Sequence, residues 1–177
     1  MKDYDKTPEG KEHLSICIVG HVDAGKSTTT GHLLHKLGTM SEREREKLQK
    51  EADDMSMGSF AFAHFLDTQP DEKKRGITIK PTTKEFFTEK YHFTIIDCPG
   101  HKDFIKNMMI GASQADVVIV MVPAEVGGLE KAIADGSKDG GQTGQTRQHT
   151  ELCYLRGIKQ VIVCVNKMDD KSVKWGE

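Results

Sequence analysis

The sequence of 177 residues lacks several features that mark special classes of protein. No apolar run approaches the ~20 residues of a membrane span, and the polar residues 1–13 contain no signal-peptide core. The formal net charge is only −2, so no overall basic field indicates nucleic-acid binding. The four cysteines show no disulfide spacing. These absences favour a soluble globular protein from a reducing, cytoplasmic compartment, without membrane contact.

What the sequence does contain is a series of short β-rich apolar runs. Runs without alternation are typical of strands that are buried on both faces, as in parallel sheets. Helical patterns lie between them, so we predict an α/β domain with a doubly wound, mostly parallel sheet and helices on both faces. The domain would occupy residues 14–177, after the polar segment 1–13. The predicted strands are Leu14–Val19, Phe93–Ile96, Val117–Val122 and Val161–Val165.

Two helices and one loop can be placed between these runs. An apolar stripe at helical spacing predicts a helix within 102–113. Residues 41–55 are expected to form an exposed helix, since Ser41 and Glu44 make a capping box. The glycine-rich stretch 135–146 predicts a loop.

The stretch "GHVDAGKST" stands between the first apolar run and a helix-like stretch over 29–37. It fits the pattern GxxxxGK[ST], in which backbone N–H groups and the helix N-terminus bind phosphate oxygens. Lys26 would contact the β- and γ-phosphates, and Ser27 would offer its hydroxyl to Mg²⁺. The predicted phosphate loop consists of Gly20, His21, Val22, Asp23, Ala24, Gly25, Lys26, Ser27 and Thr28.

The stretch "NKMD", which comprises Asn166, Lys167, Met168 and Asp169, follows the last apolar run and favours guanine as the base. The Asp169 carboxylate can accept hydrogen bonds from guanine N1–H and the exocyclic amino group. Adenine has no donors there and would leave the carboxylate unpaired. The Lys167 stem can cover one ring face, and Asn166 can brace the phosphate loop.

A third motif, "DCPGH", ends the run at 93–96 and contains Asp97, Cys98, Pro99, Gly100 and His101. Asp97 is predicted to complete the Mg²⁺ site, and Gly100 can bring its N–H close to a γ-phosphate. Cys98 with His101 could instead be a zinc half-site, but a second pair of ligands is missing. Because all three motifs end strands, we expect them at one edge of the sheet.

Together with "RGITI" and the longer stretch "DCPGHKDFIKNMMIGASQAD", these motifs resemble the GTP-binding domain of translation elongation factors. The flanks resemble the elongation factor 1-alpha and elongation factor-like branch. The resemblance implies that the Thr78 hydroxyl binds Mg²⁺ only in the GTP state and that His101 places the attacking water. Val22 and Ile77 match the apolar gate around that histidine.

The resemblance also implies a GTP/GDP switch whose intact form delivers aminoacyl-tRNA to the ribosome and is served by a guanine nucleotide exchange factor. The stretch 127–146 looks longer than in ordinary elongation factor 1-alpha. We expect the chain to be a fragment that lacks the C-terminal part of the domain and both β-barrel domains of the family. The "VIVCV" run at 161–165 would then be an exposed, association-prone edge.

Two other functions stay open. A release-factor GTPase also fits "GASQAD", although "HKDFIKN" favours the elongation factors. A non-catalytic nucleotide-binding fragment, used as an interaction module, is the alternative from another class.

Overall fold

The computed structural model describes residues 9–54, 61–66, 69–135 and 143–174. Its centre is a five-stranded sheet in the order β2-β3-β1-β4-β5. The strand β1 pairs in parallel with β3 and β4, β4 pairs in parallel with β5, and β2 is antiparallel to β3. The strands are β1 (Glu12–Gly20), β2 (Thr82–Phe87), β3 (Tyr91–Asp97), β4 (Val117–Pro123) and β5 (Gln160–Asn166).

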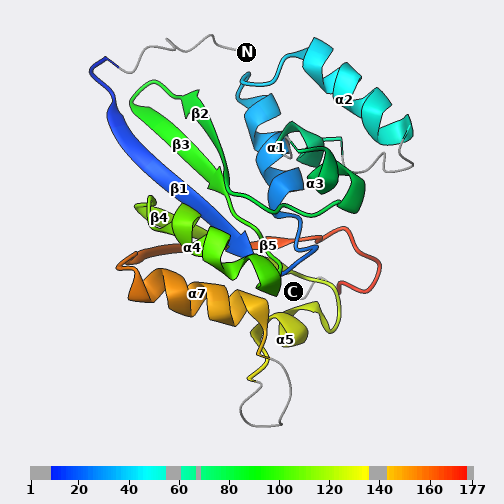
Figure 1. The fold of residues 1–177 in the computed structure, drawn as a ribbon, viewed down its shortest axis with the longest axis vertical. Coiled ribbons are helices and arrows are strands. Elements are labelled where there is room, and N and C mark those ends of the chain that lie inside the picture. Colours follow the sequence, from blue (N-terminus) through cyan, green and yellow to red (C-terminus); the bar gives the residue numbers. More distant parts are fainter. Residues whose placement is uncertain (1–8, 55–60, 67–68, 136–142, 175–177) are drawn as a thin grey trace.

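Helices cover both faces of this sheet, as predicted (Figure 1). The helix α1 packs on one face, with α2 and α3 on the same side, while α4 and α7 pack on the other face. A short α5 lies beside α7. The helices are α1 (Lys26–Lys36), α2 (Glu42–Asp54), α3 (Pro70–Arg75), α4 (Ile105–Ala112), α5 (Gly128–Ile133) and α7 (Gln145–Leu155), with short 3₁₀ turns η2 (Ala63–Phe65) and η3 (Lys102–Phe104).

The side chains of β1 alternate between the two faces of the sheet and belong to two separate apolar cores. Ile18 packs with Leu34 of α1, whereas Cys17 and Val19 pack with Met108 of α4. Successive side chains of a strand point to opposite faces, so the apolar residues 16–19 supply both cores at once. The predicted strand at 14–19 and its burial on both faces are therefore confirmed.

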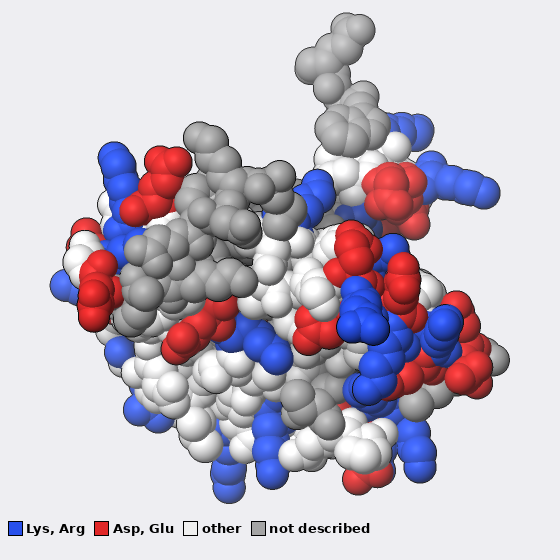
Figure 2. Space-filling model, turned by 90° about the horizontal axis from the view of Figure 1, so that it is seen from above, with Lys and Arg blue, Asp and Glu red and all other residues white. Residues whose placement is uncertain are grey.

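The helix expected over 41–55 is α2, and its capping box is present. The Ser41 N–H donates to the Glu44 carboxylate (3.0 Å), and the Glu44 N–H donates to the Ser41 hydroxyl (3.3 Å). Figure 2 shows acidic and basic side chains interspersed on the face that it presents, without a field of one sign. None of the helices in the described part of the chain is both long and apolar enough to cross a membrane.

Several features of the fold differ from the sequence prediction. The strand β2 was not predicted, because its sequence "TTKEFF" is half polar and lies at an antiparallel edge. The helix α1 begins at Lys26 rather than at residue 29, since Gly25 at φ 84° turns the phosphate loop directly into the helix. The predicted loop 135–146 is wrong at its end, because α7 begins at Gln145; residues 136–142 lie outside the described residues.

The strand β5 forms the other edge of the sheet and is poorly covered. The side chains of Val161, Ile162, Val163 and Val165 are 49%, 53%, 63% and 52% exposed. Burial on both faces was therefore the wrong prediction for this run, and the expected exposed edge is confirmed. Such an edge, apolar, β-branched and uncharged, favours pairing with other chains.

We predict that the 177-residue chain self-associates through β5. Val163→Lys should reduce this association, because a charge on an exposed edge strand opposes pairing, while the free energy of unfolding changes by only about 0.5 kcal/mol. Sedimentation velocity over a concentration series measures the effect. Gln114→Lys, which adds the same charge at an exposed helix end, is the control. Equal association of Val163→Lys and the parent would contradict the prediction.

Candidate nucleotide-binding site

The three sequence motifs meet at the carboxyl ends of the parallel strands. Gly20 ends β1, Asp97 ends β3 and Asn166 ends β5. The strand β1 lies between β3 and β4, so the chain leaves it at the position where the strand order reverses. Open α/β sheets bind their ligands in this crevice.

The phosphate loop folds tightly around the Lys26 ammonium group. Lys26 is only 7% exposed, and its Nζ donates to the carbonyl of His21 at 2.8 Å. Gly100 approaches this ammonium group so closely that any added Cβ would collide with it. The Lys26 ammonium group lies between the loop and the "DCPG" turn, where it can contact the oxygens of a phosphate that binds in the loop.

The predicted metal-binding residues lie together at the base of the loop. The Ser27 hydroxyl donates to Asp97 Oδ2 at 2.5 Å and lies 3.1 Å from the Thr78 hydroxyl. Asp97 is fully buried, and its Oδ1 has no hydrogen-bond partner among the described residues. Burial raises the pKa of Asp97 to about 6, against the hydrogen bond from Ser27. One unpartnered carboxylate oxygen beside two hydroxyl groups is a donor set that suits Mg²⁺.

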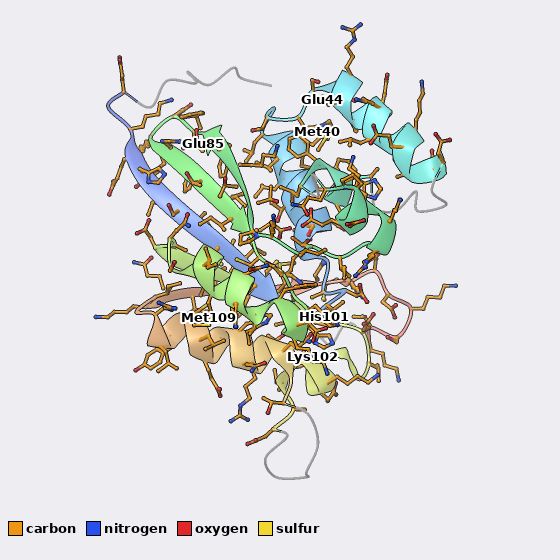
Figure 3. All side chains as sticks on the ribbon, in the orientation of Figure 1. Met40, Glu44, Glu85, His101, Lys102 and Met109 are labelled. Carbon is orange, nitrogen blue, oxygen red and sulfur yellow. The ribbon has the colours of Figure 1, made fainter. Side chains whose placement is uncertain are left out.

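His101 lines the same cavity as the phosphate loop. Val22, Ile77 and Thr78 are also in its wall, so the two predicted gate residues and the predicted Mg²⁺ ligand Thr78 share one cavity with the histidine. His101 lies at the turn before α4 (Figure 3), and its Nδ1 accepts a hydrogen bond from the Asp103 N–H at 3.2 Å. This bond caps η3 and fixes the ring, with 34% of the side chain still exposed.

The "NKMD" turn contacts the phosphate loop through Asn166. Its Nδ2 donates to the carbonyl of Ala24 at 2.9 Å, which is the predicted brace. Lys167 adopts a left-handed φ of 59°, and its ammonium group pairs with Glu125 at 3.2 Å. Met168 is half-buried and Asp169 is exposed beyond the strand end. An exposed carboxylate at this position is free to meet a ligand from solvent.

The side chain of Cys98 does not point into the predicted nucleotide site. It is completely buried in the core under α4, where its Sγ lies 3.0 Å from the Sγ of Cys17. Any contact of this residue with a ligand would have to be made by its backbone. The zinc alternative is also unsupported, because the described residues contain no group of three or more His, Cys, Asp or Glu that could hold a metal ion.

Sequence reasoning missed the contribution of α7 to the site. The His21 N–H donates to the Thr146 hydroxyl at 3.0 Å. With its amide oriented to satisfy its neighbours, Gln145 donates to the carbonyl of Gly100 at 2.9 Å and accepts from the Lys102 N–H at 3.0 Å. Both residues fall within the predicted glycine-rich loop. Leu152 and Cys153, three and four residues after the buried His149, give the helical spacing that indicates α7.

The fold and this site define a P-loop nucleotide-binding domain. Comparison with known proteins narrows the class: the family "Elongation factor Tu GTP binding domain" matches residues 11–175. The chain therefore belongs to this family of translational GTPases.

Curated relatives agree with this assignment. The chain is 52% identical to elongation factor 1-alpha of Tetrahymena pyriformis over 167 residues, which cover 94% of the chain and 37% of the relative. It is 49% identical to elongation factor 1-alpha of Plasmodium falciparum over 167 residues, which cover 94% of the chain and 36% of the relative. The chain thus spans about a third of the length of the relatives it matches.

Solved structures share the fold. The Ski7 GTPase-like domain of S. cerevisiae bound to GTP superposes with a TM-score of 0.74 at 23% identity, covering 90% of this chain and 35% of that one. Sup35 complexed with GDP gives a TM-score of 0.58 at 31% identity, and the match covers 100% of this chain and 32% of the Sup35 chain.

We predict that His149 makes the domain less stable as pH falls. His149 of α7 is fully buried, and burial together with the Lys26 charge lowers its pKa to about 4 from 6.5. Between pH 6.5 and pH 4 this histidine is protonated in the unfolded chain but neutral in the folded chain. The free energy of unfolding therefore falls as the pH falls through this range. The shift corresponds to about 3 kcal/mol.

Urea unfolding of the parent and of His149→Gln between pH 7 and pH 4 measures this effect. Other groups titrate equally in both proteins, so the difference between their free energies of unfolding isolates the histidine. The parent should lose stability relative to the variant as pH falls. Parallel pH profiles would show that His149 does not titrate with folding.

Proposed function

We propose that the protein binds GTP with Mg²⁺ and hydrolyses it as the nucleotide switch of a translation elongation factor. The observation that carries the proposal is the cluster of Ser27, Thr78 and Asp97 at the base of the phosphate loop. The cluster joins a residue of the phosphate loop, a residue of the "RGITI" segment and the end of β3. A bound γ-phosphate would therefore affect the positions of all three segments.

The side chains divide the chemistry between binding and hydrolysis. Lys26 neutralises the β- and γ-phosphates, and the loop N–H groups together with the N-terminus of α1 hold their oxygens. Ser27, Thr78 and Asp97 would hold Mg²⁺, which would neutralise charge on the β- and γ-phosphate oxygens. His101 orients the attacking water, with Val22 and Ile77 as the apolar gate around it.

The proposed partners are those of the intact protein. The curated relatives are elongation factors, which supports the ribosome, aminoacyl-tRNA and an exchange factor as partners in the cytoplasm. Stimulation by the ribosome would complete the geometry around His101. No observation on the site favours the release-factor alternative or a non-catalytic fragment.

Base choice tests the guanine assignment. Asp169→Asn should weaken GTP binding and favour xanthosine triphosphate, because xanthine has a carbonyl where guanine has its amino group, and an amide can donate to it. Two hydrogen bonds to a charged group, at about 1.5–3 kcal/mol each, set an upper limit of roughly 3–6 kcal/mol. Competition titration with GTP, ATP and XTP measures it. Asp170→Asn is the neighbouring control, and an unchanged GTP preference in Asp169→Asn would overturn the assignment.

Substitution of the histidine tests hydrolysis separately from binding. His101→Ala in the intact protein should keep its affinity for GTP and lose ribosome-stimulated hydrolysis by a factor of about 10²–10⁴, the value of an orienting or acid–base side chain. Lys102→Ala, one residue further and exposed, is the matched control. Single-turnover assays with and without ribosomes give both rates. A variant that hydrolyses GTP at the parent rate would assign His101 to the capping of η3 alone.

A further inference from the structure

Glu72 is a buried carboxylate that the proposed mechanism does not use. It lies on α3, a helix of six residues, and is only 1% exposed. Its Oε1 accepts hydrogen bonds from the N–H groups of Ile79 (2.9 Å) and Lys80 (3.0 Å). A buried charge is costly unless it is fully hydrogen-bonded, so these bonds are the reason that the carboxylate can be buried.

The main chain of Glu72 holds the same segment from the other side. Its carbonyl accepts from the Gly76 N–H at 2.8 Å and from the Ile77 N–H at 3.3 Å. Gly76 ends the helix in the left-handed conformation at φ 63°, which turns the chain back toward the carboxylate. Residues 76–80 therefore wrap around a single glutamate, and Thr78 stands in the middle of the wrapped segment.

A residue of α4 holds the segment at a second point. The Asn107 amide donates to the carbonyl of Ile79 at 2.8 Å. The peptide groups that flank Ile79 are thus held from two elements, by Glu72 through the N–H and by Asn107 through the carbonyl. Thr78 immediately precedes them, with its hydroxyl 3.1 Å from that of Ser27.

An ordinary helix cap explains only part of this arrangement. Glu72 Oε2 accepts from the Gln69 N–H at 3.2 Å, which completes the capping box of α3. The cap needs only that oxygen. It does not account for Oε1, which contacts the segment seven and eight residues further along the chain.

We propose that Glu72, assisted by Asn107, is a positioning residue that holds the Thr78 hydroxyl in place for the γ-phosphate form of the site. The inference rests on the proposed GTP-binding function. Fixing a backbone segment in advance removes the conformational cost of ordering it when the nucleotide binds. Glu72 thus acts through Thr78 and touches neither nucleotide nor metal.

The test compares two nucleotides in the intact protein. Glu72→Gln should weaken binding of a non-hydrolysable GTP analogue with Mg²⁺ by roughly tenfold, since two charge-assisted bonds become neutral ones. Binding of GDP should stay unchanged, because Thr78 serves only the γ-phosphate form. Asp71→Asn, an exposed acid one residue earlier on α3, is the matched control and should change neither affinity.

A double substitution decides whether the effect passes through Thr78. Thr78→Ala should lower affinity for the analogue by itself, and Glu72→Gln should add nothing to it, because a hydroxyl that is absent cannot be positioned. Additive losses would overturn the proposal. An equal loss for GDP and the analogue would also overturn it, and would assign Glu72 a purely structural role.

A milder variant covers the case in which Glu72→Gln does not fold. Asn107→Ala removes one neutral hydrogen bond at a half-buried position, and it should give the same selective loss at a few-fold scale. Unselective or absent loss there would overturn the proposal. If the parent itself binds neither the analogue nor GDP, the proposed function fails, and that result is distinguishable from a parent that binds both while the variants show no selectivity.

Discussion

The hydrogen bond between the Ser27 hydroxyl and the buried Asp97 carboxylate is the contact on which the rest of the site depends. A carboxylate that is completely buried must have polar partners, and the sheet presents Asp97 at the end of β3, level with Ile18 of β1. The helix α1 must therefore begin at Lys26 so that its first turn brings Ser27 to that strand end. The position of the phosphate loop follows from this pairing of sheet, helix and buried charge.

The supports around the loop are polar and come from several elements. Asn166 at the end of β5 holds the Ala24 carbonyl, and Thr146 at the start of α7 holds the His21 N–H. Gln145 connects the same helix to the turn that carries His101. Each bond ties the phosphate loop or the "DCPG" turn to another element, so the start of α7 connects the loop directly to that turn.

The sequence predicts most of this arrangement because its strands are β-branched runs and its loops are fixed-spacing motifs. Prediction from the sequence fails where a local signal competes with a tertiary contact. No helix is predicted for α7, because the glycine-rich composition assigns its start, including Gln145, to a loop, and a half-polar sequence hid β2. Glu72 sits in the charged stretch "PDEKKR", where exposure is the usual state; only the fold turns that carboxylate inward.

Different forces stabilise the sheet with its helices and the segment that follows α3. The sheet and its helices bury two apolar cores, which gain stability only when they are packed closely and therefore resist partial rearrangement. The segment after α3 is held mainly by hydrogen bonds to Glu72 and Asn107, with Thr78 as its buried hydroxyl. Hydrogen bonds of this kind can be exchanged for bonds to water when the segment and the Glu72 carboxylate become exposed together. The proposed switch segment can therefore be released while the sheet that presents Asp97 and the phosphate loop stays in place.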